Sequence, residues 1–154
     1  MTLKLLSAAF LLGGLLLAGG AALTSNSVVA DDSAMEDIEH RLVMQVNTDD
    51  LRTQAMALNN IVNLQKHYGI DNITIELVAY GPGLSMLTKE SQSLERITSL
   101  LQQEVTFTAC GNTMDTIESE TGKRPELIPE VGMAQTGVAR IIELQEAGYA
   151  YVRP

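Results

Sequence analysis

Residues 105–115 read VTFTACGNTMD, a short apolar run that ends at the protein's only cysteine, Cys110. The glycine and the small polar residues that follow are typical of a helix start. We therefore expect a strand over 105–109 that leads through Cys110 into a helix over 112–121. The carboxyl ends of parallel strands hold most functional sites in α/β proteins, and a helix N-terminus stabilises a thiolate.

Apolar runs and helical repeats alternate along the rest of the chain. We expect strands over 42–46, 72–80, 105–109, 127–131 and 149–152, and helices over 51–68, 91–104, 112–121 and 133–147. Residues 84–89 fit a single helical turn. The connections are long enough for crossovers, so the sequence predicts one α/β domain. Its five-stranded, mainly parallel sheet has helices on both faces, a three-layer α/β/α arrangement.

The first thirty residues have the features of an export signal. Lys4 supplies positive charge, a leucine-rich run follows, and residues 28–30 offer compact side chains before an acidic pair. An uncleaved membrane anchor is the alternative, since the apolar run is nearly long enough to cross a bilayer. Either way, we expect the domain in the periplasm. The predicted organisation is a signal over 1–30, a flexible acidic leader over 31–40 and the domain over 41–154.

Charge limits the classes of partner. The formal net charge is -9, and Lys4 is the sole charged side chain of the first thirty residues, so the domain itself is more acidic still. Nucleic acids and anionic lipid heads need clustered basic residues, which are missing here. We expect no nucleic acid partner, and membrane contact only through an uncleaved N-terminal segment. A lone cysteine forms no internal disulfide.

Cys110 carries the main functional hypothesis. The amides after it would stabilise a thiolate, which sulfur transfer, peroxide reduction and acyl transfer all require. The alternative is a buried, inert cysteine, because free cysteines are among the most buried residues. Three loops, 47–50, 81–87 and 110–115, should meet at the carboxyl edge of the sheet. The predicted site is Cys110 as the reactive group, with ligand-binding residues Asn112, Thr113, Tyr80, Gly81 and Asn47.

Other catalytic machinery is not expected. His40 lies in or near the leader and His67 late in the first helix, so neither suits a Cys–His dyad. The chain has no CxxC motif, and its Gly81-Pro82-Gly83 turn lacks the lysine of a phosphate-binding loop. No cofactor is predicted.

Soft metal ligands are a third possibility. Met86, Met114 and Met133 fall after successive predicted strands, and with Cys110 they would suit Cu(I). Methionines more often pack in cores or interfaces, so we predict no metal.

Four segments together resemble the DsrE/DsrF-like proteins over residues 41–154: FTACGNTM at 107–114, VAYGPGL at 78–84, LNNI at 58–61 and LQEAGYAYVRP at 144–154. The resemblance implies a three-layer α/β/α domain with a five-stranded parallel sheet, assembled as a trimer or hexamer. It also implies that the cysteine after the third strand, here Cys110, carries sulfur as a persulfide and hands it to a partner's cysteine.

The export signal sets this chain apart from the well-understood members, which act in the cytoplasm. The resemblance therefore implies a periplasmic sulfur carrier or transferase, with a sulfur donor or acceptor protein as partner. The alternative is a non-enzymatic module for a small ligand or redox partner, with Cys110 merely packed. Exposed apolar residues on the last helix or in the 81–87 loop are expected to form the subunit contacts.

Overall fold

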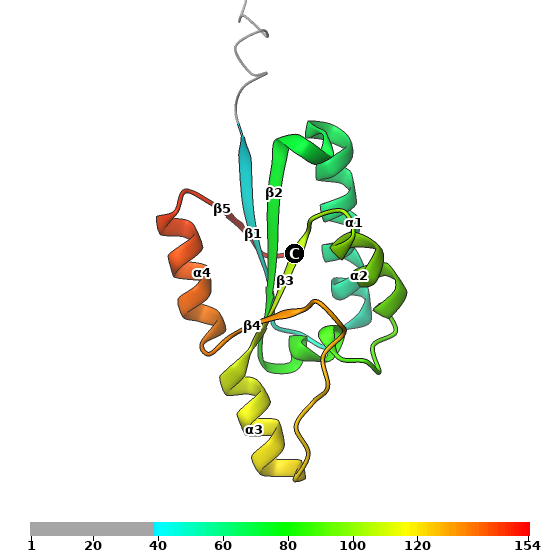
Figure 1. Cartoon of the computed structure of the whole chain (residues 1–154), viewed down its shortest axis with the longest axis vertical. Helices are drawn as coiled ribbons and strands as arrows, with labels where there is room; N and C mark the ends of the chain where they lie inside the picture. Colours follow the sequence, from blue (N-terminus) through cyan, green and yellow to red (C-terminus); the bar gives the residue numbers. More distant parts are fainter. Residues whose placement is uncertain (1–38) are drawn as a thin grey trace, which may run out of the picture. The chain divides into compact units, whose positions relative to one another are not determined.

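A computed structural model describes residues 39–154. The predicted export signal and nearly all of the acidic leader lie outside the described residues. The strands are β1 (His40–Val46), β2 (Ile73–Ala79), β3 (Thr106–Cys110), β4 (Gly132–Ala134) and β5 (Ala150–Val152). They form one sheet in the order β4-β3-β2-β1-β5, and every pairing is parallel (Figure 1). The predicted α/β fold class is confirmed.

Helices lie on both faces of this sheet. They are α1 (Leu51–Tyr68), α2 (Leu94–Leu101), α3 (Gly111–Thr121) and α4 (Gly137–Glu146), with 3-10 helices η2 (Ile70–Asn72) and η3 (Gly81–Leu87). Figure 1 shows α1 and α2 beside one face and α4 beside the other, which gives the three predicted layers. Helix α3 continues β3 beyond the carboxyl edge of the sheet.

Local sequence signals explain the bounds of α1, which match the prediction. The Asp50 carboxylate accepts a hydrogen bond from the Thr53 amide at 2.7 Å, so it satisfies one of the free N–H groups at the helix start. At the other end, Gly69 has φ 90°, a conformation that glycine adopts without steric cost. These two residues place α1 between β1 and β2.

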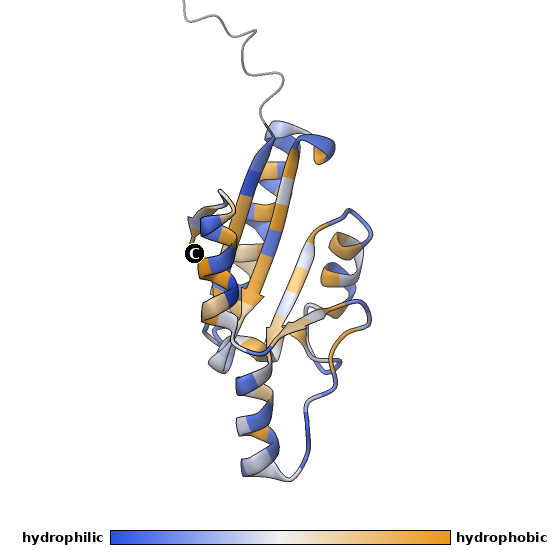
Figure 2. Ribbon diagram, turned by 60° about the vertical axis from the view of Figure 1, so that its left-hand side comes forward, coloured by the Kyte–Doolittle hydropathy of each residue, from blue (hydrophilic) through white to orange (hydrophobic). Residues whose placement is uncertain are grey.

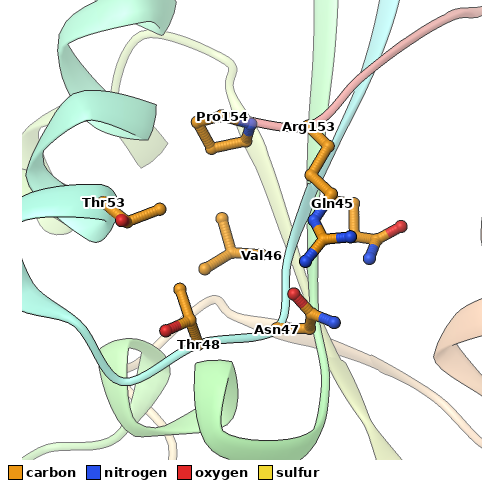
Figure 3. Close-up of a pocket in the computed structure, with 7 residues that line it drawn as sticks. All are labelled: Gln45, Val46, Asn47, Thr48, Thr53, Arg153 and Pro154. Carbon is orange, nitrogen blue, oxygen red and sulfur yellow. The ribbon is translucent and has the colours of Figure 1, made fainter.

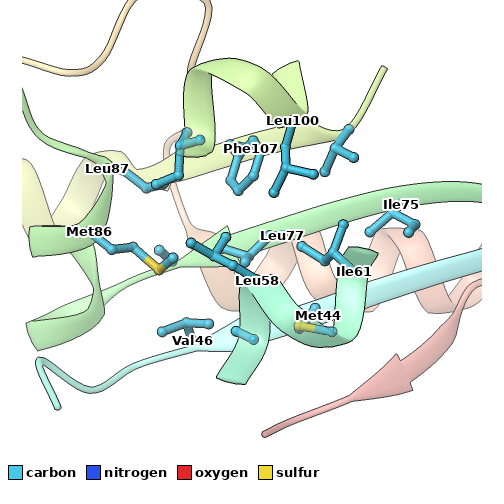
Figure 4. Packing of buried hydrophobic residues seen from close by; sticks show 14 of the residues in the cluster. Met44, Val46, Leu58, Ile61, Ile75, Leu77, Met86, Leu87, Leu100 and Phe107 are labelled. Carbon is cyan, nitrogen blue, oxygen red and sulfur yellow. The ribbon is translucent and has the colours of Figure 1, made fainter. Parts of the chain in front are cut away.

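Most of the core lies between the sheet and helices α1 and α2. Alternate residues of the central strands point to this face, among them Met44, Leu77 and Phe107, and all three are fully buried (Figure 4). The opposite face has a smaller apolar cluster in which Val43 and Val78 contact Ile141 and Leu144 of α4. In Figure 2 the central strands are mainly orange, as expected for parallel strands buried on both faces.

Helix η3 packs tightly against the end of β1. A Cβ on Gly83 would lie 2.3 Å from the Val46 carbonyl oxygen, so only glycine fits here. The apolar side chains of this helix, Leu84, Met86 and Leu87, are buried in the core. The expectation that the 81–87 loop offers exposed apolar residues for subunit contacts is therefore wrong.

The fourth strand was also placed wrongly. The sequence predicted 127–131, whereas β4 is Gly132–Ala134 and pairs with β3. Leu127 instead bridges to Thr88 in antiparallel fashion, and Ile128 donates its amide to Leu87. Glu130 then has φ 71°, which turns the chain before it can continue as a strand. The apolar pair 127–128 thus closes the core rather than extending the sheet.

Helix α4 begins four residues later than predicted, because Met133 and Ala134 belong to β4. Ile141 and Leu144 face the sheet, whereas Val138 and Ile142 are 48% and 51% exposed. Residues four apart share a helix face, so these two form an apolar stripe directed away from the core. Within residues 39–154, no helix combines the length and hydrophobicity needed to cross a bilayer.

Candidate functional site

Cys110 lies where β3 ends and α3 begins. It is the last residue of the strand and the N-cap residue of the helix. Phe107 and Ala109 point into the core under α1 and α2, so the alternation of a strand directs Thr108 and Cys110 to the α4 face. Cys110 is 5% exposed and belongs to neither apolar cluster.

The Cys110 sulfur is surrounded by backbone polar groups. Its Sγ accepts a hydrogen bond from the Gly137 amide at 3.3 Å and lies 3.9 Å from the Gln135 carbonyl oxygen, to which the thiol donates. Gly137 is the first residue of α4. The sulfur therefore sits at the N-termini of two helices, α3 and α4, and each end contributes partial positive charge.

These donors change the acidity of the thiol. Burial by itself raises the pKa of Cys110, because the charged form loses hydration. Hydrogen bonds from the Thr113 side chain and from the amides of Gly137, Thr113 and Asn112 outweigh burial, and the net pKa lies below the ordinary value. The residue is buried, as the inert-cysteine alternative expected, yet its surroundings favour the thiolate.

Gly137 allows this close approach. A Cβ at Gly137 would lie 3.1 Å from the Cys110 Cβ and 3.4 Å from both Tyr80 and Val78. Sequence reasoning missed Gly137. The available signal was a Thr-Gly pair just before the apolar repeat of the last helix, which is typical of a helix start.

Three of the predicted ligand-binding residues lie close to the cysteine: Thr113 in the first turn of α3, and Tyr80 and Gly81 after β2. The Thr113 hydroxyl accepts a hydrogen bond from the Gly81 amide at 2.9 Å, which ties the start of α3 to the loop after β2. Tyr80 lies next to Gly137, and its hydroxyl accepts a hydrogen bond from Gln45 at 2.6 Å.

Asn112 fastens the start of α3 to the segment before α4. Its amide donates to the Gln135 carbonyl at 2.9 Å, and its side-chain oxygen accepts from Gln135 Nε2 at 2.8 Å. Its Nδ2 also donates to the Thr136 hydroxyl at 3.2 Å. Asn112 therefore holds the two residues that lead to Gly137, rather than presenting a free side chain to a ligand.

Asn47 is not part of this group. It follows β1, two strands away from β3 in the sheet, and it lines a separate cavity with Gln45 and Arg153. The three loops do share the carboxyl edge of the sheet. Only the loops after β2 and β3 meet at Cys110.

A partly buried ion pair joins α4 to β2 about one turn of α4 beyond Gly137. The Glu76 side chain is 5% exposed, and Arg140 binds it with both prongs of the guanidinium, at 2.9 Å and 2.8 Å. The Thr108 hydroxyl donates to the same carboxylate at 2.7 Å. The Glu76 carboxylate also raises the pKa of Arg140. Sequence reasoning missed this pair; its signal was one acidic residue within the apolar strand ITIELVA.

The two histidines lie elsewhere. His40, expected in or near the leader, is the first residue of β1, and its ring centroid is 3.8 Å from that of Tyr68. His67 lies in the last turn of α1 and also contacts Tyr68. β1 begins at the amino edge of the sheet, whereas Cys110 lies at the carboxyl edge, so His40 cannot serve the thiol as a base.

The three methionines considered as Cu(I) ligands do not lie together. Met86 and Met114 belong to the core under α1 and α2, whereas Met133 is 54% exposed and contacts Arg124. Packing accounts for the first two. In the described part of the chain, no cluster of three or more His, Cys, Asp or Glu side chains is placed to hold a metal ion.

The sequence model of the DsrE/DsrF-like family matches residues 40–154. A protein of unknown function, MTH1491 from Methanobacterium thermoautotrophicum, is 30% identical with a TM-score of 0.68 over 75% of this chain and 99% of that one. YchN from E. coli is 10% identical with a TM-score of 0.60 over 76% of this chain and 100% of that one, which shows a shared fold. No curated protein matches.

Proposed function

The chain belongs to the DsrE/DsrF-like family, and from that premise we propose that it is an exported sulfur carrier in which Cys110 holds sulfur as a persulfide. One observation carries the proposal. Cys110 Sγ accepts the Gly137 amide at 3.3 Å, at a point where two helix N-termini meet. Such donors favour the thiolate, which is the nucleophile in sulfur transfer.

The proposed step conserves atoms and electrons. The Cys110 thiolate attacks the terminal sulfur of a donor persulfide or polysulfide, so that one S–S bond forms at Sγ. The donor's S–S bond breaks, and its inner sulfur leaves as a thiolate with the bonding electron pair. The new persulfide is anionic at its outer sulfur, and the same reaction in reverse passes that sulfur to an acceptor thiolate. No external oxidant is required.

Compartment and assembly belong to the same proposal. We place the carrier in the periplasm, because its first thirty residues have the composition of an export signal. We assign subunit contacts of a trimer or hexamer to the exposed apolar stripe of α4, Val138 and Ile142. A partner protein would supply or accept the sulfur.

Intact mass spectrometry after incubation with polysulfide tests the carrier. We expect one adduct of about 32 Da, the mass of one sulfur atom, mapped to Cys110 and removed by dithiothreitol. Cys110→Ser should carry none. Wild-type protein alkylated at Cys110 beforehand is the matched control for sulfur bound elsewhere. An unmodified wild type, or an adduct that persists in Cys110→Ser, contradicts the proposal.

The burial of Cys110 favours a second candidate, a non-enzymatic binding module with the cysteine as a packing residue. In that case Cys110→Ala retains its oligomeric state and its affinity for ligand or redox partner, and the wild type acquires no sulfur. Size-exclusion chromatography with light scattering on both proteins, beside the mass measurement, separates the two candidates.

A further inference from the structure

The strand order reverses at β1. Strands β2, β3 and β4 follow it on one side, whereas β5, the last in sequence, lies on the other. Helix α1 leaves β1 over one face, and α4 leads into β5 over the opposite face (Figure 1). In open α/β sheets, the crevice at the carboxyl ends of strands where the order reverses is the usual place for a ligand.

A cavity occupies this position. Its volume is about 230 Å³, and it lies among residues that follow β1, begin α1 and follow β5: Gln45, Val46, Asn47, Thr48, Thr53, Arg153 and Pro154 (Figure 3). Pockets for drug-sized ligands span roughly 300–1,000 Å³, so this one suits a smaller molecule or the end of a larger one. None of these residues hydrogen-bonds to Cys110.

Some polar groups of the cavity are already engaged. Gln45 is 8% exposed, and both ends of its amide are held: Nε2 donates to the Tyr80 hydroxyl at 2.6 Å, and Oε1 accepts from the Tyr151 hydroxyl at 2.5 Å. Thr53 donates its hydroxyl to Asp50 at 2.6 Å. Gln45 and Thr53 therefore form a fixed wall rather than free ligand contacts.

The free side-chain donors of the cavity belong to Arg153 and Asn47. Figure 3 shows the Arg153 side chain reaching from the end of β5 toward Asn47. Within residues 39–154, Arg153 forms no ion pair, and no side-chain hydrogen bond engages the Asn47 amide. The guanidinium offers five N–H groups, the Asn47 amide offers two, and none of the seven lining side chains is a carboxylate.

Asp50, between the cavity residues Thr48 and Thr53 in sequence, is engaged at the start of α1. Asp50 caps α1, where its Oδ2 accepts from both the hydroxyl and the amide of Thr53. The hydrogen bond from the Thr53 hydroxyl has the larger effect and that from the Thr53 amide the smaller, and both lower the pKa of Asp50 below its usual range. The Asp50 carboxylate is thus directed at the helix start rather than at the cavity.

We propose that this cavity binds a small oxyanion, a carboxylate or a sulfate-like group, through the Arg153 guanidinium, with the Asn47 amide as a second donor. A planar guanidinium pairs with two oxygens of such a group at once, which gives both affinity and orientation. The site is separate from Cys110 and goes beyond the sulfur-carrier function. It gives the domain a second point of contact for a small anionic ligand.

Titration of the full domain with sodium acetate and, separately, sodium sulfate tests the site, with chloride held constant. Two-dimensional ¹H–¹⁵N NMR follows the amides of 47, 48 and 53 and the Arg153 Nε–H group. We expect saturable shifts at these positions. Arg153→Met should weaken binding at least about tenfold, equal to about 1.4 kcal/mol, and Asn47→Ala should weaken it by a smaller factor.

Arg52→Met is the matched control, because Arg52 lies in the first turn of α1 near the cavity but does not line it. It removes the same charge and should leave affinity within about twofold. If only acetate saturates the shifts, the site is specific for carboxylates. If only sulfate does, it is specific for tetrahedral oxyanions. If both do, the site recognises the pair of oxygens that the two groups share.

Three results would overturn the inference: linear shifts with neither anion saturating, unchanged affinity in Arg153→Met, or equal losses in Arg153→Met and Arg52→Met. Cys110→Ala should bind the anions as wild type does, and Arg153→Met should still accept sulfur. Failure of the carrier function and failure of this site are therefore distinguishable.

Discussion

The two faces of the sheet differ in composition. On the α1 and α2 side, every buried residue of β1, β2 and β3 is apolar, and the cluster is continuous (Figure 4). On the α4 side, only four buried apolar residues form a cluster, and next to them lie Gln45, Glu76, Thr108 and Cys110. One sheet thus presents an aliphatic face and a largely polar one.

The two faces of the sheet therefore have different roles. Burial of apolar area is the main source of stability, so the α1 and α2 face should hold the fold together. On the α4 face each polar group is held by a specific hydrogen bond, and these bonds set the position of α4 against Cys110. Substitutions on the α1 and α2 face should change the free energy of unfolding, and substitutions on the α4 face should change the pKa of Cys110.

Phe107→Ala should have the largest effect on stability. Phe107 is fully buried in the aliphatic face, and truncation of such a side chain costs about 3–5 kcal/mol through lost burial and the cavity left behind. Urea denaturation measures the change in free energy of unfolding. In native buffer, the pH dependence of Cys110 alkylation should match the wild type.

Thr108→Val is the matched control, since the adjacent residue faces α4 and loses one hydrogen bond to Glu76, at a cost of about 0.5–1.5 kcal/mol. If Phe107→Ala shifts the thiol pKa while Thr108→Val leaves both stability and thiol unchanged, the separation of the two faces is wrong.

Glu76→Gln should combine a moderate loss of stability with a change at the thiol. Arg140 loses its charged partner, and because its side chain is 37% exposed, we expect a cost of about 1–3 kcal/mol. Two explanations of its influence on Cys110 predict opposite signs. If the pair positions α4, loosening it moves the Gly137 amide from the sulfur, and the thiol pKa rises. If Arg140 acts through its charge, its unpaired charge favours the thiolate, and the pKa falls.

We expect the thiol pKa to rise, measured from the rate of iodoacetamide alkylation against pH. Arg140→Lys keeps the charge but loses the two-pronged geometry, so it should also raise the pKa. The ionisable groups of the surrounding elements are Glu76 on β2 and Tyr80 after it, Arg140, Glu143 and Glu146 on α4, and Asp115, Glu118 and Glu120 on α3, with Arg124 in the segment after α3. Glu126→Gln, which breaks an exposed pair with Lys89, is the control and should change neither quantity.

The same contrast explains what could be predicted from the sequence. The aliphatic face depends on periodicity, so β1, α1, β2 and the run into Cys110 were predicted within one or two residues. Gly69 and Asp50 gave the ends of α1 directly. Local pattern also located Cys110 at the junction of a strand and a helix.

The polar face depends on contacts between residues far apart in sequence. Gly137 is 27 residues from Cys110, and Arg140 is 64 residues from Glu76, so no local pattern links them. The fourth strand was misplaced for a related reason: the apolar character of 127–131 was read correctly, but its partner is Leu87 rather than β3. The sequence located Cys110 and its neighbour Thr113, but not Gly137 or the Glu76–Arg140 pair.

Gly137→Ala should act on the thiol with a smaller effect on stability. The added Cβ would lie 3.1 Å from the Cys110 Cβ, so α4 must move by a few tenths of an ångström, at a cost of about 1 kcal/mol. The amide then moves from Sγ, and the thiol pKa should rise, which alkylation against pH detects. Gly132→Ala is the control, because its Cβ would lie 3.6 Å from the Phe107 carbonyl oxygen, an ordinary contact. Equal profiles for Gly137→Ala and wild type would remove the Gly137 amide from the account.

The smallest effect is a pH dependence of stability. The folded state lowers the pKa of Cys110, so the unfolded state binds the proton more tightly. The resulting stabilisation is fully present above the unfolded pKa of the thiol and is lost as the pH falls through the folded pKa.

Cys110→Ser keeps a similar shape without a titrating group in this range. The free energy of unfolding of wild type minus that of Cys110→Ser should therefore increase with pH between the two pKa values, with a slope of at most about 1.4 kcal/mol per pH unit. Other titrating groups cancel in this difference, which urea denaturation at several pH values measures. A difference that stays flat or falls with rising pH would mean that burial outweighs the hydrogen bonds, and Cys110 would then belong with the aliphatic face as a packing residue.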